Sequence, residues 1–364
     1  MFLLGVTFVE VLKWIGYVLV ALLCLMVMIM IHETGHYVAG KLFNFTILEY
    51  SIGFGPKIFQ KVNKKTGEKF SIRCLPLGGF CQFLGEDEEN SDPNAFNSKP
   101  PWQRIIVLFA GAFMNLLSAI IFISIFFMTF GDFVPRIEKT YDFVDSSYEQ
   151  VLEVGDVIYA IDGHNTYSLA NSNKIKKYLQ DTSSVTLTIE RNGEMIEIVA
   201  PIAEYQGTYE DTDGQIIDIH GIGLGMSISY KQVKLPFFKA IGHSFEFGWD
   251  EISLIFKTFA QVFTGQAKVS ESLGGTISAI SVLSQLAQNG FMAVMYGLCV
   301  LSISIGVMNL LPFPALDGCR IVFCIVEWIR GKPNNRKIEG IISIAGLVFL
   351  IAIAIVFDLL HFLG

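Results

Sequence analysis

The chain has 364 residues, of which 52% are hydrophobic and only 16% are charged, and its formal net charge is −8. An ordinary soluble domain carries about 25% charged residues, so the composition excludes a disordered protein and a small soluble module. The negative net charge gives no field that would attract nucleic acid, and we expect no nucleic-acid partner.

Four uncharged stretches are long enough to cross a membrane, since a spanning helix needs about 20 apolar residues. They cover residues 14–31, 105–131, 272–316 and 340–357, and the third is most apolar over residues 291–311. We therefore expect a polytopic α-helical protein with about four transmembrane helices in a lipid bilayer. A cleaved signal peptide explains the first stretch less well, because no small-residue cleavage site follows it.

The distribution of Lys and Arg predicts the orientation of the chain, because cytoplasmic loops collect these residues. Nine of them lie in residues 41–104 and five in residues 320–337, whereas the first 12 residues contain none. We therefore expect these two loops on the cytoplasmic side and both termini outside the cytoplasm. The segment 131–235 holds 17 acidic and 8 basic residues, which suits an exported soluble domain.

Two regions outside the apolar stretches have the pattern of β-strands. Residues 47–60 and 69–84 partly alternate apolar and polar side chains on either side of a polar turn. This pattern predicts a β-hairpin (47–84) at the cytoplasmic membrane face. In the acidic segment, Arg191-Asn192-Gly193 joins two further β-patterned runs and indicates a second hairpin.

Residues 152–163, in which a Gly-Asp turn leads into a strand that ends in Asp-Gly, resemble the core motif of PDZ domains. PDZ domains bind extended peptides at a sheet edge, and we expect a short helix at residues 174–180 beside that groove. A β-rich spacer that binds no peptide is the alternative. Between residues 234 and 264, Phe, Ile and Trp recur mostly every three or four positions, which predicts an amphipathic helix at the outer membrane interface.

The expected organisation has four parts. They are residues 1–130 with the first two transmembrane helices and the cytoplasmic-face hairpin, residues 131–233 as an extracytoplasmic PDZ-like β-rich domain, residues 234–270 as the amphipathic interfacial helix, and residues 271–364 with the last two transmembrane helices.

The sequence His32-Glu33-Thr34-Gly35-His36 follows the first apolar stretch and matches the HExxH pattern. Residues four apart share one face of a helix, so both imidazoles can bind one Zn²⁺. The carboxylate of Glu33 lies beside the first ligand, where it can act as the general base. Three polar groups at the end of a membrane span are costly in lipid, which favours a functional site over a polar cap.

A catalytic zinc site usually has three protein ligands and one open position. Asp317 ends the uncharged run of 45 residues at the inner side of the third span, so it can meet His32 and His36 at the same depth. Cys319 is the alternative soft ligand. We expect the remaining histidines on the outer side, and these are His164, His220, His243 and His361.

Two prolines interrupt the chain just before Asp317. Pro312 and Pro314 are expected to break the helix that the third span forms. The segment 309–314 would then leave backbone groups that can pair with a peptide.

These motifs resemble the site-2 protease family of intramembrane zinc metalloproteases, in particular its bacterial members with a single PDZ domain. Residues 32–36 match the family's HExxH, and NLLPFPALDG at 309–318 matches its NxxPxPxLDG. Residues 51–56 and 75–80 look like its membrane-associated hairpin, and residues 110–115 look like its second-span motif.

The resemblance implies that Asp317 supplies the third zinc ligand beside His32 and His36, and that Glu33 is the catalytic residue. It also implies substrate contacts in the second span, in the hairpin and in the broken segment. The candidate substrate-binding residues are Asn115, Asn309, Gly53, Gly55, Pro312 and Pro314.

We therefore expect an intramembrane zinc metalloprotease in a bacterial inner or plasma membrane, with its active site near the cytoplasmic face. The resemblance implies that it cleaves single-span membrane proteins, such as anti-sigma factors or signal-peptide remnants, within or near their transmembrane segment. The PDZ-like domain would filter or dock substrates already trimmed outside. The alternative is a non-catalytic membrane scaffold or metal-handling protein, against which Glu33 argues, since a metal carrier needs no base beside its ligands.

Overall fold

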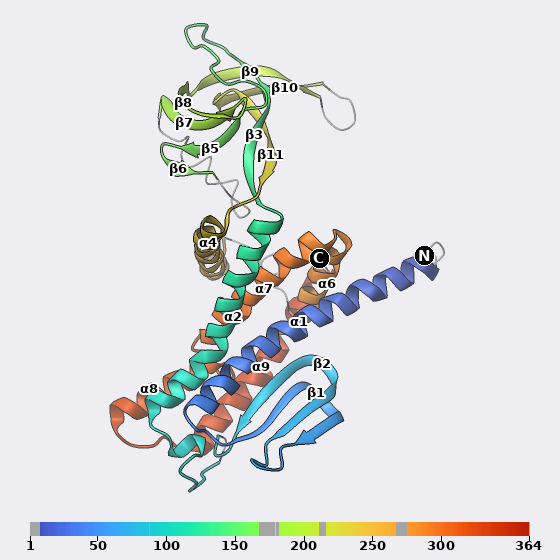
Figure 1. The fold of residues 1–364 in the computed structure, drawn as a ribbon, viewed down its shortest axis with the longest axis vertical. Helices are drawn as coiled ribbons and strands as arrows, with labels where there is room; N and C mark the ends of the chain where they lie inside the picture. Colours follow the sequence, from blue (N-terminus) through green and yellow to red (C-terminus); the bar gives the residue numbers. More distant parts are fainter. Residues whose placement is uncertain are drawn as a thin grey trace. The chain divides into compact units, whose positions relative to one another are not determined.

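The computed structural model describes residues 8–86, 88–166, 179, 182–210, 216–266 and 275–363. The chain divides into two compact units (Figure 1). The first combines Met1–Ser124 with Ile241–Gly364 and holds most of the helices, and the second is Ile125–Ala240 and is mainly β-sheet.

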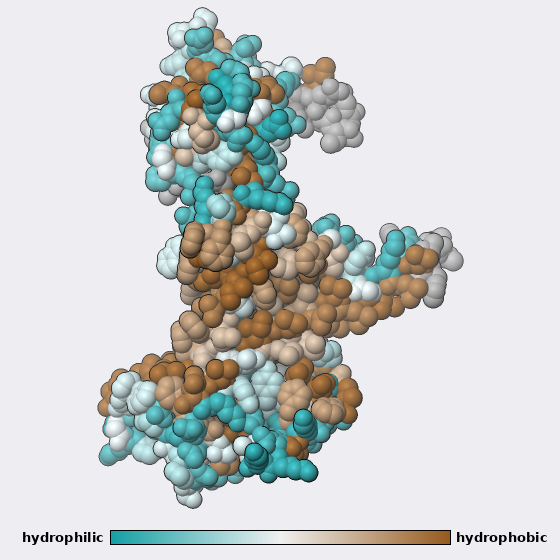
Figure 2. All heavy atoms as spheres, in the orientation of Figure 1, coloured by the Kyte–Doolittle hydropathy of each residue, from teal (hydrophilic) through white to brown (hydrophobic). Residues whose placement is uncertain are grey.

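Four helices of the described chain are long and apolar enough to cross a membrane, in agreement with the predicted number. They are α1 (Phe8–Leu42), α2 (Pro101–Thr129), α7 (Phe291–Leu310) and α9 (Arg336–Leu363). Large apolar side chains are exposed along them, as lipid contact requires. Figure 2 shows these hydrophobic residues gathered over the helices, whereas hydrophilic residues cover much of the β-structure.

The third uncharged stretch forms two helices instead of one. The shorter helix, α6 (Thr276–Gln288), ends at Gln288, and α7 begins after Gly290. Gly290 has a φ of 93°, which an L side chain rarely adopts, so the chain turns there and only α7 has the length of a span. The helix α8 (Asp317–Arg330) follows after the proline-containing segment.

The predicted β-hairpin is present as β1 (Ile47–Val62) and β2 (Lys69–Phe83). Both strands bend, so that four segments lie side by side in the order 57–62, 69–73, 49–52 and 79–83. The last segment therefore forms one edge of the small sheet. Its apolar side chains Cys81 and Phe83 join a buried cluster with Val107 of α2 and Cys324 of α8, which fixes the hairpin against the helices.

The second unit contains a six-stranded and a three-stranded sheet. The first has the order β11-β3-β5-β7-β8 with β6 paired to β5, and the second has the order β10-β9-β4. The strands are β3 (Asp132–Thr140), β4 (Asp142–Phe143), β5 (Val157–Ile161), β6 (His164–Asn165), β7 (Ser184–Arg191), β8 (Glu194–Pro201), β9 (Ala203–Glu210), β10 (Ile216–Gly223) and β11 (Met226–Val233).

The core of this unit follows the strand patterns in the sequence. Ile158, Leu187 and Ile189 are almost fully buried between the strands. The hairpin predicted at residues 191–193 joins β7 to β8, with positive φ at Asn192 and Gly193 as a tight hairpin turn requires. The helix predicted at residues 174–180 falls almost wholly outside the described residues.

The amphipathic helix predicted within residues 234–270 is present as α4 (Phe237–Phe263). Its exposed apolar side chains include Phe238, Phe245 and Trp249, while Phe247 and Glu251 are buried. The exposed apolar face agrees with the sequence periodicity, whereas the burial of Glu251 was not predicted.

Candidate active site

The two histidines of the HExxH motif lie on one face of α1, as the helical spacing predicts. The distance between His32 Nε2 and His36 Nε2 is 3.1 Å, and both side chains are buried. His36 Nδ1 donates a hydrogen bond of 2.8 Å to the carbonyl oxygen of Val107 in α2. Because Nδ1 then carries the ring proton, Nε2 presents a lone pair, which is the form that binds a metal.

Asp317 reaches the two histidines from the distant end of the chain. Its Oδ2 lies 3.0 Å from His32 Nε2 and 3.2 Å from His36 Nε2. Asp317 is also the first residue of α8, where the helix dipole favours a negative charge.

The chain turns sharply between α7 and α8 to bring Asp317 into this position. Leu311 is extended, Phe313 and Leu316 close short turns, and Ala315 has a φ of 80°. A side chain on Gly318 would lie 2.3 Å from the carbonyl oxygen of Leu311, so only glycine fits after the aspartate.

The three donor atoms fit a zinc ion. Zinc with ligand bonds of 2.0–2.1 Å in a tetrahedron holds its ligands about 3.3 Å apart, close to the 3.0–3.2 Å separations here. A side chain on Gly111 of α2 would come within 2.4 Å of His36 Nε2 and 2.8 Å of His32 Cε1, so this glycine leaves room beside the donor atoms. Among the described residues these three form the one group with metal-ligand geometry, and Cys319 is not part of it.

Glu33 faces the same cleft as the three candidate ligands. The cleft has a volume of about 520 Å³. Its walls come from α1, from the hairpin edge at residues 80–83, from α2 and α7, and from the start of α8. Gly79 lies against Glu33, since a side chain on this glycine would contact Glu33 Cγ at 3.4 Å.

The other predicted site residues are not all brought to this cleft. Asn309 lines it, and its Nδ2 donates to the carbonyl oxygen of Ile305. Asn115 is fully buried and lies against His32. Pro312 and Pro314 are in the turn before Asp317 and do not line the cleft.

Gly53 and Gly55 lie in the bent middle of β1 and also do not line the cleft. Their φ values are 84° and 81°. A side chain on Gly53 would lie 2.7 Å from the carbonyl oxygen of Leu75. The two glycines therefore allow the bend and the close approach of β1 and β2.

Sequence patterns missed an ion pair on the cleft wall. Arg320 of α8 pairs with Glu86, which follows β2, and both side chains line the cleft. Glu86 also accepts a hydrogen bond of 3.1 Å from the backbone N–H of Phe83. In sequence, Glu86 opens an acidic run typical of a solvated loop, and no spacing links it to Arg320.

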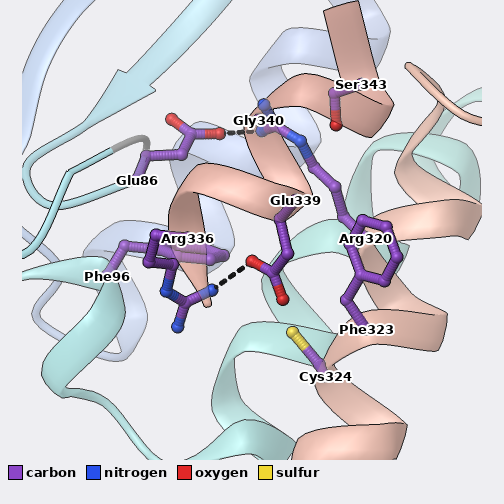
Figure 3. Close-up of a pocket in the computed structure, with 9 residues that line it drawn as sticks. All are labelled: Glu86, Phe96, Arg320, Phe323, Cys324, Arg336, Glu339, Gly340 and Ser343. Atoms are coloured by element: carbon purple, nitrogen blue, oxygen red, sulfur yellow. Dashed lines mark hydrogen bonds and ion pairs between the residues drawn. The ribbon is translucent and has the colours of Figure 1, made fainter. Parts of the chain in front are cut away.

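Further charged residues surround a small cavity of about 40 Å³ next to Arg320 (Figure 3). Arg336 Nη1 lies 2.7 Å from Glu339 Oε2 at the start of α9. Glu327 of α8 pairs with the buried Arg104 of α2 and also lies 3.4 Å from Arg336. This network ties α8, which carries Asp317, to α2 and α9.

The helical unit and its histidine-aspartate cluster define a membrane metalloprotease. The family model described as "Peptidase family M50" matches residues 20–353 of the chain. The chain therefore belongs to peptidase family M50, the site-2 protease family.

Three bacterial relatives of the chain are named "Putative zinc metalloprotease". The protein of Fusobacterium nucleatum is 33% identical over 92% of this chain and 94% of its own length. Those of Clostridium perfringens and Clostridium acetobutylicum are 31% and 29% identical over 93% of this chain, and over 96% and 95% of their own lengths.

The family assignment decides between the two functions that the sequence leaves open. The chain is a zinc-dependent metalloprotease with several membrane-spanning helices. A scaffold without catalytic activity is not what the family or the cleft geometry supports, because Glu33 shares the cleft with the candidate ligands.

Proposed function

We propose that the protein is an intramembrane protease that cleaves single-span membrane proteins within or near their transmembrane segment. The observation that carries this proposal is the place of the cleft. His32 and His36 lie on an apolar helix long enough to cross a membrane, and Asp317 follows another such helix. A substrate bound at this cleft would be cut where lipid surrounds the enzyme.

His32, His36 and Asp317 are the proposed zinc ligands, and Glu33 is the proposed general base. Zinc, when bound, supplies a Lewis acid that polarises the scissile carbonyl and makes water a stronger nucleophile. Glu33 takes the proton of the attacking water and passes it to the leaving amine. Asn309 also lines the cleft, and the second N–H of its side-chain amide can donate a hydrogen bond to the substrate backbone while the first bonds Ile305.

The hairpin offers a place for an unwound substrate. A helix hides its backbone amides, so the substrate must become extended before it can be cut. The segment 79–83 is an edge of the hairpin sheet, and its residues 80–83 line the cleft. An extended substrate added to this edge would place its backbone beside Glu33. Gly53, Gly55, Pro312 and Pro314 would support this strand capture indirectly, by shaping the hairpin and the turn.

The second unit is proposed to be an extracytoplasmic PDZ-like domain that filters or docks substrates already trimmed outside. Its sheets and its Gly-Asp turn before β5 support this assignment. The basic loops support a cytoplasmic location for the active-site end and an extracytoplasmic one for both termini, in a bacterial cell membrane. Anti-sigma factors and signal-peptide remnants are the substrates that the family resemblance favours.

Cleavage of a tagged single-span protein in proteoliposomes tests the proposal. The substrate carries either a short outer tail or its full outer domain. We expect cleavage of the trimmed form, loss of cleavage with a zinc chelator, and recovery on adding Zn²⁺. Mass spectrometry of the products should place the cut within or next to the transmembrane segment. A cut confined to the soluble parts of the substrate would contradict intramembrane proteolysis.

A further inference from the structure

We propose that Asn115 is a positioning residue that holds the ring of His32 in its metal-binding tautomer, in place of the substrate contact that the sequence motif indicates. The inference rests on the proposed zinc ligands. It assigns to this asparagine a role that acts through the ligand and not through the substrate.

Asn115 is buried away from the cleft. Its side chain is 0% exposed, and it is not among the residues that line the cleft. A substrate in the cleft could therefore reach this amide only after α2 moved. The amide lies instead 3.4 Å from His32 Nδ1, on the side of the ring away from Asp317.

His32 must carry its ring proton on Nδ1 when it binds a metal through Nε2. Its Nε2 faces Asp317 and His36, so this nitrogen must present the lone pair when a metal is bound. The ring proton then sits on Nδ1, which needs an acceptor. His36 already has such an acceptor in the carbonyl oxygen of Val107. Asn115 supplies the corresponding partner for His32.

The side-chain amide of Asn115 can turn either its nitrogen or its oxygen toward His32. The structure has Nδ2 next to His32 Nδ1, and Oδ1 is buried without a hydrogen-bond partner. The two ends of an amide are assigned from the surrounding hydrogen bonds, not from its shape. With the proton on His32 Nδ1, the amide turns so that Oδ1 accepts it. Metal-bound histidines are usually oriented by such a partner.

Hydrogen bonds from two serines hold the backbone of Asn115 in place. Its backbone oxygen accepts hydrogen bonds from Ser118 at 2.9 Å and from Ser302 of α7 at 2.8 Å. The two serine hydroxyls also lie 2.9 Å apart. The residue that orients His32 is thus tied to the helix that leads to Asp317.

Metal affinity separates a positioning residue from a substrate contact. Asn115→Leu and Asn115→Ala both remove the hydrogen-bond acceptor. The leucine side chain is similar in size to asparagine, and the alanine side chain is smaller. Asn115→Asp keeps an acceptor at the same place. Zinc affinity of the full-length protein in detergent is measured by competition with a chromophoric chelator, and kcat and KM are measured at saturating zinc. Ser124→Ala is the matched control, because Ser124 is a buried polar residue of α2 that bonds Ser244.

We expect Asn115→Leu and Asn115→Ala to weaken zinc binding by about 10- to 100-fold, the usual effect of losing such a partner. Asn115→Asp should stay within about threefold, and Ser124→Ala should not change. KM at saturating zinc should be unaltered in all folded variants. Unchanged zinc affinity with a raised KM would overturn the inference and return Asn115 to substrate binding. His32→Ala, run in parallel, tests the ligand set itself, since full zinc occupancy there would contradict the proposed function instead.

Discussion

Glu33 is the residue at which binding and chemistry can be separated. It shares the cleft with His32 and His36 but does not belong to the group of three donor atoms. Glu33→Gln should therefore keep its zinc and lose about 10²- to 10⁴-fold in kcat, as expected for the loss of a general base. Zinc content by mass spectrometry and cleavage of a trimmed substrate check both halves. Cleavage at the original rate would exclude Glu33 as the base.

Asp317, and not the nearby Cys319, belongs to the group of three donor atoms. Asp317→Ala should lower the zinc content of the purified protein, because two histidines alone leave the site one ligand short. Cys319→Ala should retain zinc, since Cys319 is buried outside the donor group. Full zinc occupancy in the Asp317 variant together with loss in the Cys319 variant would reverse the assignment.

The grouping of His32, His36 and Asp317 could be predicted from sequence because each lies in a short motif with helical or proline-rich spacing. The contact between Asn115 and His32 could not be predicted from the sequence. Asn115 is 83 positions away, and its motif indicates a substrate contact, whereas the packing of α1 against α2 buries it beside the ring. The ion pair between Arg320 and Glu86 was not predictable either. These residues are 234 positions apart, and the sequence around each is typical of a solvated loop.

At the scale of the elements, the charged residue at the start of α2 holds three helices together. Arg104 is 1% exposed, and its Nη1 lies 3.1 Å from Glu327 Oε2 in α8. Breaking a buried ion pair costs about 3–5 kcal/mol. Since Arg336 also contacts Glu327, we expect Arg104→Leu to lose about 3 kcal/mol.

Reversible unfolding in mixed micelles measures this loss. The pair of Glu68 with the exposed Lys41 gives the control, because Lys41→Gln should cost less than about 1 kcal/mol. Arg104→Met combined with Glu327→Leu should recover much of the stability, since an apolar pair avoids the desolvation of two charges. Equal effects of Arg104→Leu and Lys41→Gln would show that burial adds nothing to the pair.

The hairpin should lose stability in acid through Glu49. Burial raises the pKa of Glu49, but hydrogen bonds from Ser71 and Arg73 and the charge of Lys57 lower it below its ordinary value of 4.5. A carboxyl whose pKa is lowered by folding stabilises the fold above pH 4.5 and loses that contribution as the pH falls through the lowered pKa.

Protection of the hairpin from an acid-active protease should therefore decline below pH 4.5, and Glu49→Gln should make the decline shallower. Glu68, which pairs with the exposed Lys41, serves as the comparison in the variant Glu68→Gln. A decline of the same steepness in Glu49→Gln would assign the acid sensitivity to other groups.

Helix number, hairpin position and the amphipathic helix were predictable because hydrophobic period and charge are local properties. The separate helix α6 before the third span was not predictable, because Gly290 interrupts a stretch that is apolar on both sides. The order of the four segments in the hairpin also depends on bends at Gly53 and Gly55 that no alternation pattern shows.

At the scale of the whole molecule, the second unit should be removable. Asp132 of β3 and Val233 of β11 are paired neighbours, so a short Gly-Ser linker can join them in place of residues 133–232. We expect this variant to bind zinc normally, because every donor atom belongs to the first unit. It should also cleave a substrate that keeps its large outer domain, which we expect the full chain to reject. Equal rejection by both proteins would contradict the filter.

Because 285 positions separate His32 from Asp317, the ribosome adds these two residues to the growing chain at different times. A ribosome adds about 5–20 residues per second, so roughly 15–60 s pass between the synthesis of the first ligand and the last. During that time the growing chain holds two imidazoles but no third donor, and it cannot assemble the cutting centre. Chains that stop before Asp317 lack the same donor atom. We therefore expect proteolytic activity only after Asp317 has been synthesised and has reached His32 and His36, so that shorter nascent chains do not cleave neighbouring membrane proteins.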